Sequence, residues 1–338
     1  MSDTKLVQHN ENFCRQYTIH TLRKGDFDHF WCTVFLANDF PKRVIAAIRA
    51  FNLEISRVRD RASQDHLAKI RLQFWYDAIE KIYTQPEAII ESGEPVLQEI
   101  KSVSVINRTH LHQWISDFFS SLLFSSLQCN EIVGGKMSKR WFLRMIEARQ
   151  SHFGLADFPF NTLNEYESYC ESTHCSANYL INEALVHYHR DLAPEKVLLK
   201  LDHMGNHLGK AQGLANLVRG ITFNAKNNRC YIPSEMLIKH NVTHQDFLRQ
   251  NNLEKIRDVC FDLSSKSHQH LSKAKDLTRD ASLRPYYATF LPIFVVQRFL
   301  TKLQKNNFNI FRPTWGQADL FLPLNLLFRT KFSRFFRL

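Results

Sequence analysis

The sequence predicts an all-α, single-domain protein, and three observations favour this class. Only 10 glycines and 10 prolines occur in 338 residues, too few for the turns of many short strands. Apolar residues make up 44% of the chain, enough for a substantial core. The 27 phenylalanines offer large rings for helix–helix interfaces. Long helices around one core therefore account best for the composition.

The clearest helix is expected from Pro41 onward, with Asn38 or Asp39 available as its cap. Apolar residues follow spacings of four, three, four and three there, which makes one helix face: Val44, Ile48, Phe51, Ile55 and Val58. Further helices are predicted over 67–84, 96–102, 139–149, 163–189, 195–223 and 285–305, with two more inside 243–278.

No repeat or low-complexity linker divides the chain. We therefore expect a tail over residues 1–14, one domain over 15–319 and a basic amphipathic segment over 320–338. Residues 107–138 differ in composition from their neighbours and are predicted to be an insertion. They contain FFSSLLFSSL and a Gly134–Gly135 pair.

The C-terminal segment supports two interpretations. At 100° per residue, four apolar side chains share one face: Leu324, Phe328, Phe332 and Phe335. Arginines lie off this face, but Lys331 falls within it. The segment therefore either lies on an anionic membrane or docks on the domain as a final helix.

A net charge of +11 favours anionic partners. There is no block of basic residues, zinc-finger spacing or aromatic RNA-binding motif, so nucleic acid is not expected. An anionic membrane or an acidic protein surface is the better candidate. No apolar run reaches the roughly 18 residues of a membrane-spanning helix.

The seven cysteines are scattered and include no CxxC pair, which is typical of reduced, buried thiols. Cys170 and Cys175, with His174 between them, lack a second ligand pair at metal spacing, so no metal is expected there.

Four stretches, in order, resemble the squalene/phytoene synthase family. They are HFWCTVFLANDFPKRVIAAIRAFN (29–52), RLQFWYDAIEKIY (71–83), YESYCESTHCSANYL (166–180) and GKAQGLANLVRGITFNAKNNRCYIP (209–233). The resemblance implies an isoprenoid-synthase-type helical bundle with a central cavity. Family enzymes join prenyl diphosphates, and Mg²⁺ held by an Asp-x-x-x-Asp pair on each of two helices stabilises the leaving diphosphate.

Matched to this family, the first aspartate pair falls on Ser56 and Asp60, and the second on Gly220 and Asn224. One of the four aspartates remains. Leu53 also stands where the enzymes have an arginine, and His29 where they have a serine. We therefore expect no catalytic residue, no metal and no cofactor.

A residual pocket is expected around Gln212, Asn216, Arg219 and Arg229. The two arginines could form an anion-binding spot at the pocket mouth, or serve as ordinary helix-surface residues. A lipid or isoprenoid is a second hypothetical ligand, because apolar helical pockets accept such molecules.

A narrower resemblance is to the group of this family that assembles mitochondrial respiratory complex I. It rests on AIRAFNLEISRVRD, RLQFWYDAIEKIY, HLGKAQGLANLVRGITF and FNIFRPTWGQADLFLPLNLLF. It implies an inactive, matrix-side protein that is peripheral to the inner membrane and contacts complex I subunits or other assembly factors.

Two features depart from that group. Residues 107–138 have no recognised counterpart, and residues 1–16 are a poor transit peptide because they contain Asp3 and Glu11. Import by an internal signal, a truncated start and a cytosolic pool all stay open. The alternatives in function are an active Mg²⁺-dependent prenyl synthase and a lipid- or isoprenoid-binding module.

Overall fold

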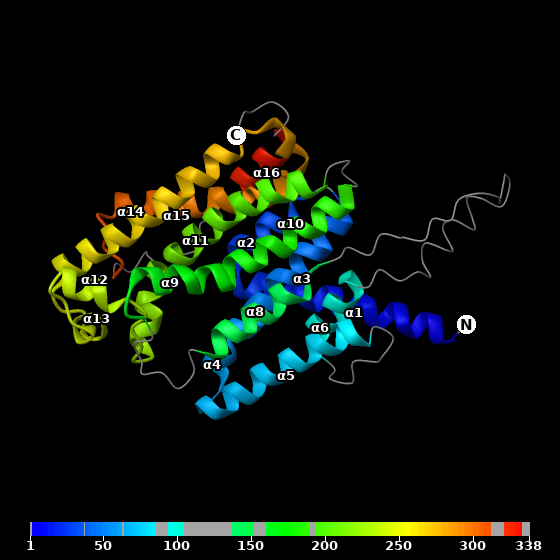
Figure 1. The fold of residues 1–338 in the computed structure, drawn as a ribbon, viewed down its shortest axis with the longest axis horizontal. Coiled ribbons are helices and arrows are strands. Elements are labelled where there is room, and N and C mark those ends of the chain that lie inside the picture. Colours follow the sequence, from blue (N-terminus) through cyan, green and yellow to red (C-terminus); the bar gives the residue numbers. More distant parts are fainter. Residues whose placement is uncertain are drawn as a thin grey trace.

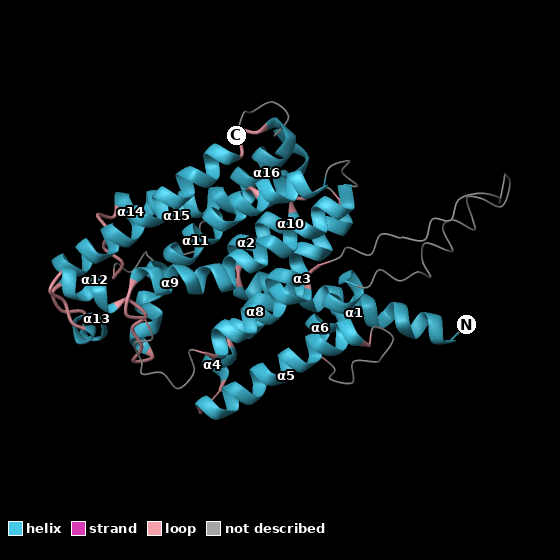
Figure 2. Ribbon diagram, in the orientation of Figure 1, coloured by secondary structure: helices cyan, strands magenta, loops and turns pink. Residues whose placement is uncertain are grey.

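The computed structural model describes residues 2–36, 38–62, 64–85, 94–104, 137–151, 160–189, 194–311 and 321–332. Every regular element in these ranges is a helix, as Figure 2 shows, which confirms the predicted all-α class. The elements are α1 (Ser2–Gly25), α2 (Phe27–Val34), α3 (Asp39–Ser56), α4 (Val58–Arg61), α5 (Asp65–Thr84), α6 (Pro95–Ser104), α8 (Lys139–Gln150), α9 (Leu163–Cys170), η1 (Glu171–Cys175), α10 (Ser176–His189), α11 (Pro194–Lys226), α12 (Ser234–Lys239), α13 (His244–Arg249), α14 (Leu253–Leu277), η2 (Ala281–Thr289), α15 (Leu291–Lys305) and α16 (Leu322–Phe332).

The long helix α11 runs through the middle of the bundle and belongs to both parts of the core (Figure 1). Its first half, with Leu208, packs into a cluster formed mainly by α3, α5, α6, α8, α10 and α15. Its second half, with Leu217, packs into a cluster that includes α9, α12, α13 and α14. A helix buried over so much of its circumference has little amphipathic character, which suits a central position.

Glycines every four residues let α11 approach its neighbours closely. Gly205, Gly209 and Gly213 lie on one helix face. A Cβ atom at Gly213 would overlap the side chain of Cys170, and one at Gly209 would overlap Cys175. The six described cysteines are all buried and free, as the sequence predicts, and these two fill the contact with α11.

The neighbour that α11 meets here is not a regular α-helix. Over Glu171–Cys175, between α9 and α10, the backbone forms a π-helical turn. The sequence predicts one uninterrupted helix over 163–189, and this turn is a departure from it. Such turns insert an extra residue and change the direction of the side chains around it.

The N-terminal region also differs from the prediction. Residues 2–14, predicted to be a tail, form the first half of α1, and Cys14 is buried with its thiol 3.0 Å from Gln98 Oε1 of α6. The helix is polar and weakly amphipathic, so periodicity gave no clear signal. The proposed domain limits at residues 15 and 319 stay predictions.

Two helices begin at residues other than those that the sequence predicts. Helix α3 begins at Asp39, and Asn38 occupies its cap position without a side-chain capping bond. The predicted 285–305 helix divides into η2, which contains Pro285, and α15, which begins at Leu291. Pro292, at the start of α15, explains the break, because proline lacks the N–H that a continuous α-helix needs and its ring clashes with the carbonyl four residues earlier.

The C-terminal helix α16 docks on the bundle through Leu322 and Leu326, which are buried, and it contacts α2 and α15. Phe321, Leu324 and Phe328 are more than half exposed. None of the described helices has both the length and the apolar character needed to cross a membrane. Residues 105–136 of the predicted insertion and residues 333–338 lie outside the described part of the chain.

Candidate ligand-binding cavity

A cavity of about 450 Å³ lies between the two motif helices, α3 and α11. Side chains from α8, α9, the π-helical turn and α15 complete its walls. Its volume falls within the range of small-molecule sites in proteins. The predicted central cavity is thus present, and it is lined by residues far apart in the sequence.

Most of the predicted site residues meet at this cavity. Ser56, Asp60 and Asn224 line it, and Gly220 lies on α11 one turn before Asn224. The four residues of the predicted residual pocket also line it: Gln212, Asn216, Arg219 and Arg229. Gln212 is buried, whereas Asn216 and Arg219 are exposed, so α11 runs along the cavity from its interior to its mouth.

Both arginines at the mouth already have carboxylate partners. Arg229 Nη1 lies 2.7 Å from Asp60 Oδ1, and Arg219 Nη1 lies 2.8 Å from Asp28 Oδ2. The Arg219 guanidinium also lies 4.8 Å from the ring centre of Phe299. The sequence left open whether these arginines bind an anion or are surface residues, and their ion pairs leave little free charge for an anion.

The carboxylates of the cavity do not fit a Mg²⁺–diphosphate site. Among the described lining residues the only acids are Asp26 and Asp60. Both Asp26 oxygens lie within 2.9 Å of His29 Nδ1, and Asp60 is paired with Arg229. Burial alone would raise the pKa of Asp26, but His29 and Arg49 together lower it. A magnesium site needs several free oxygen ligands, and this donor set lacks them.

Two arginines that the sequence analysis missed lie in the interior of the cavity. Arg49 of α3 and Arg149 of α8 line the cavity and are only 4% and 8% exposed. Arg49 Nη2 donates to Asn178 Oδ1 at 2.8 Å. Arg149 donates to Met145 O at 2.7 Å and to Asn52 Oδ1 at 2.8 Å. Neither makes an ion pair with a described carboxylate.

These two charges dominate the electrostatics of the interior. Burial lowers the pKa of both guanidiniums, because a low-dielectric site disfavours the charged form. The π-helical turn brings Thr173 and His174 into the cavity wall. Burial, followed by the charges of Arg149 and Arg49, lowers the pKa of His174 to about 3. His174 is therefore neutral at pH 7.

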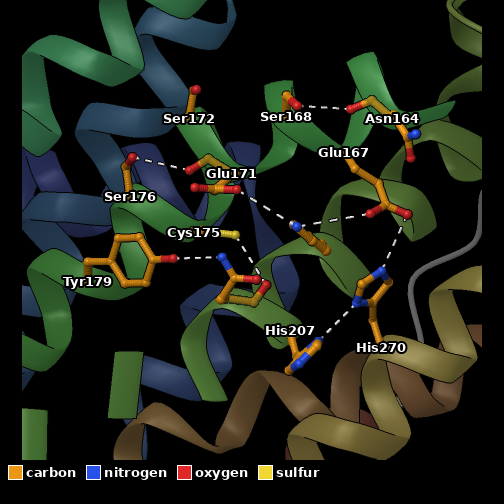
Figure 3. A network of polar contacts seen from close by, with 12 residues as sticks. Asn164, Glu167, Ser168, Glu171, Ser172, Cys175, Ser176, Tyr179, His207 and His270 are labelled. Atoms are coloured by element: carbon orange, nitrogen blue, oxygen red, sulfur yellow. Dashed lines mark hydrogen bonds and ion pairs between the residues drawn. The ribbon is translucent and has the colours of Figure 1, made fainter. Parts of the chain in front are cut away.

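A second polar cluster, shown in Figure 3, joins α9 and η1 to α11 and α14. Lys210 Nζ lies 3.7 Å from Glu171 Oε2 and 4.0 Å from Glu167 Oε2. His270 Nε2 lies 3.4 Å from Glu167 Oε1, and His270 Nδ1 lies 3.0 Å from His207 Nδ1. Here the cations and acids face one another, and we call this group the Glu167 network.

Comparison with known proteins identifies the fold family. The family model of squalene/phytoene synthase matches residues 22–321. The chain belongs to the squalene/phytoene synthase family. A dehydrosqualene synthase structure superimposes with a TM-score of 0.66 at 13% identity, covering 98% of each chain. The squalene synthase HpnC from Alicyclobacillus acidocaldarius gives 0.63 at 14% identity, covering 89% of this chain and 95% of that one.

The sequence relatives are named for complex I assembly, whereas these two solved structures are named as synthases. A Mus musculus protein named NADH dehydrogenase (ubiquinone) complex I, assembly factor 6, is 29% identical and covers 94% of this chain and 82% of its own length. Homologues with that name match in Drosophila melanogaster at 27% identity, covering 98% and 88%, and in Dictyostelium discoideum at 26%, covering 95% and 78%.

Proposed function

We propose that this protein is a catalytically inactive member of the squalene/phytoene synthase family that acts as an assembly factor for mitochondrial respiratory complex I. The observation that carries the proposal is the match to relatives named for that role. It extends over nearly the whole of this chain and most of theirs in Mus musculus, Drosophila melanogaster and Dictyostelium discoideum. The role expected is support of matrix-arm formation through contacts with complex I subunits or other assembly factors.

The direct test is loss of the protein. In cells that lack it, we expect a lower level of assembled complex I on native gels and lower NADH oxidation by isolated mitochondria. Other respiratory complexes serve as the internal control and should be unchanged. Normal complex I in the knockout would contradict the proposal.

The charges at the cavity support the absence of catalysis. Its two described acids are held by His29 and Arg229, so neither is free to bind a metal. An active Mg²⁺-dependent prenyl synthase is the alternative that this arrangement opposes. The alternative predicts release of diphosphate from farnesyl or geranylgeranyl diphosphate with Mg²⁺. We expect none above background in a radiometric assay, and turnover would overturn the inactive assignment.

A matrix location at the surface of the inner membrane is part of the proposal. The exposed apolar residues at the C-terminal helix support it. Leu322 and Leu326 hold α16 on the bundle, while Leu324 and Phe328 of α16, and Phe321 directly before it, are exposed. The net charge of +11 adds attraction to anionic lipid. A cytosolic pool is the competing hypothesis, and cell fractionation would reveal it. Protease protection in isolated mitochondria and mitoplasts tests the matrix location.

Vesicle binding tests the membrane contact with a matched pair of variants. We expect Leu324→Gln to weaken binding to phosphatidylglycerol-containing vesicles severalfold, because Leu324 is 62% exposed on α16. Leu199→Gln removes a leucine that is 74% exposed on α11 and should have no effect. Equal binding by both variants would exclude α16 as the membrane contact.

A further inference from the structure

A second, smaller cavity lies near the start of α3, where α1, α3 and α6 pack against one another and α2 completes the wall (Figure 1). Its volume is about 210 Å³, and its described lining shares no residue with that of the central cavity. Sites for whole small-molecule ligands usually begin at about 300 Å³. The smaller cavity therefore suits a single side chain of another molecule better than a complete cofactor.

Three cations and two acids line this smaller cavity. Arg43 is held by Glu99 of α6, with Nε 2.9 Å from Oε1 and Nη2 3.3 Å from Oε2, and Glu99 is only 1% exposed. Arg15 Nη2 of α1 lies 3.4 Å from Asp39 Oδ1. Lys42 lies between these two pairs in the sequence of α3 and makes no ion pair with a carboxylate that the structure describes. The lining thus has one cation more than it has acids.

Two of the three cations are available to a carboxylate from outside. The side chain of Asp39 is 76% exposed, and so open an ion pair at 3.4 Å contributes little to stability. Asp39 can therefore give up Arg15 at small cost, and Lys42 has no such partner to give up. Apolar side chains beside them, Ile19 and Val34, would cover the methylene groups of a glutamate.

The outer side of α1 extends the positive charge beyond the cavity. From residue 12 to residue 25 this helix contains Arg15, Arg23 and Lys24, and no acid. Arg15, Ile19 and Arg23 follow one another at a spacing of four residues and therefore share a face of the helix. At 1.5 Å per residue, Arg23 lies about 12 Å from Arg15 along the helix axis. A complementary segment would carry acids about two helical turns apart.

We infer that the smaller cavity and the basic face of α1 bind an acidic segment of a protein partner, which inserts one glutamate or aspartate side chain beside Arg15 and Lys42. The inference rests on the proposed function, because the partner is a complex I subunit or another assembly factor. Charge-assisted hydrogen bonds from the guanidinium and the ammonium hold the inserted carboxylate. Arg23 and Lys24 add complementary charge around it.

A membrane surface fits this site less well than a protein does. Lys42 and Arg43 are partly buried in the wall of a cavity, where a protruding side chain reaches them more readily than a flat lipid surface. Helix α1 is polar and weakly amphipathic, whereas a helix that lies on a membrane has a broad apolar face.

Rescue of cells that lack the protein tests the site. Lys42→Glu and Arg15→Glu should each restore less than half of the assembled complex I that the wild-type protein restores, at equal protein level on native gels. Lys69→Glu is the matched control, because Lys69 is exposed on α5, outside the cavity, and should rescue fully. Normal complex I in the knockout would refute the proposed function, whereas full rescue by Lys42→Glu would refute the binding site alone.

A pair of neutral variants distinguishes partner binding from a structural role of Arg15, and keeps the test decisive if a charge reversal fails to fold. Arg15→Gln should rescue less than the wild type. Asp39→Asn should rescue as well or better, because it removes the carboxylate that competes for Arg15. Equal rescue by these two variants, whether full or impaired, would overturn the inference.

Vesicle binding by the purified variants tests the membrane as the alternative occupant. Lys42→Glu should bind phosphatidylglycerol-containing vesicles as tightly as Lys69→Glu, which makes the same change in net charge. Severalfold weaker binding by Lys42→Glu alone would assign the cavity to the lipid surface and overturn the protein partner.

Discussion

The cavity and the Glu167 network lie on opposite faces of α11 and use the same kinds of side chain differently. Lys210 and His207 point to the network, whereas Gln212 and Asn216 line the cavity, about half a helical turn away. In the network, each charge faces an opposite charge or a hydrogen-bond partner (Figure 3). In the cavity, the buried Arg49 and Arg149 donate hydrogen bonds to neutral oxygen atoms and make no direct ion pair with a described carboxylate. Charge is therefore paired directly in the network, whereas the charge of these two arginines is not.

The largest loss of stability is expected at Gly213, where α11 contacts Cys170 and His174 between the network and the cavity. In Gly213→Ala, the new Cβ would overlap Cys170 Sγ and lie 2.9 Å from Cys170 Cβ and 3.2 Å from His174 Cδ2. We expect a loss of about 3 kcal/mol in the free energy of unfolding, measured by urea denaturation. Both the network and the cavity should be disturbed together.

Gly220→Ala is the matched control on the same helix. A Cβ there meets only the flexible amide of Asn224, at 3.2 Å. The substitution should stabilise the protein by up to about 1 kcal/mol, because alanine favours a helix interior. Destabilisation of similar size at both glycines would mean that close packing does not explain Gly213.

The next largest loss of stability is expected at Glu167, in the network and away from the cavity. Glu167→Gln removes the carboxylate that faces Lys210, Lys266 and His270. Its side chain is 13% exposed, so a loss of about 1–2 kcal/mol is expected in urea denaturation. An unchanged free energy of unfolding in Glu167→Gln would show that the network does not stabilise the fold.

The pH dependence of stability reports on His207 in the same network. Burial, followed by repulsion from His270, His203, Lys273 and Lys210, lowers its pKa to about 4. An unfolded histidine titrates near 6.5. Between these values the unfolded chain takes up a proton that the folded chain does not, so stability should fall as the pH drops from about 7 to 4.

Thermal melts between pH 7 and pH 4 check this contribution. His207→Gln should flatten part of the slope of stability against pH. His203→Gln, one turn away on α11, should keep a steeper slope than His207→Gln. An identical slope in the wild type and His207→Gln would show that this histidine does not contribute.

The smallest effect on stability is expected at the cavity itself. Arg49→Met should leave the free energy of unfolding within about 1 kcal/mol of wild type, or raise it, because a buried cation without a direct ion pair is removed. This result would contrast with Glu167→Gln, where the removed charge has partners. A large destabilisation by Arg49→Met would assign Arg49 a structural role and weaken the contrast.

The sequence predicted the helices well where one face is apolar and poorly where it is not. The stripe from Val44 to Ile55 lies in α3 as expected, whereas the polar α1 was predicted to include a tail. The ordered family motifs correctly indicated the fold and the cavity. The π-helical turn left no recognised mark in the sequence.

The site could be predicted only in part, because its contacts join distant positions. Asp60 and Arg229 are 169 residues apart, and periodicity does not relate them. Arg49 interrupts an apolar run on α3, and Arg149 lies three residues after Ile146 on the buried face of α8. These positions were the available signal for buried charge. Their meeting at one cavity depends on the packing of α3 against α8, which only the folded structure shows.

The free energies of unfolding of Glu167→Gln and Arg49→Met, measured side by side by urea denaturation, test the contrast between the two regions most directly. The account predicts a loss of about 1–2 kcal/mol for Glu167→Gln and a change within about 1 kcal/mol for Arg49→Met. A larger loss for Arg49→Met than for Glu167→Gln would contradict it.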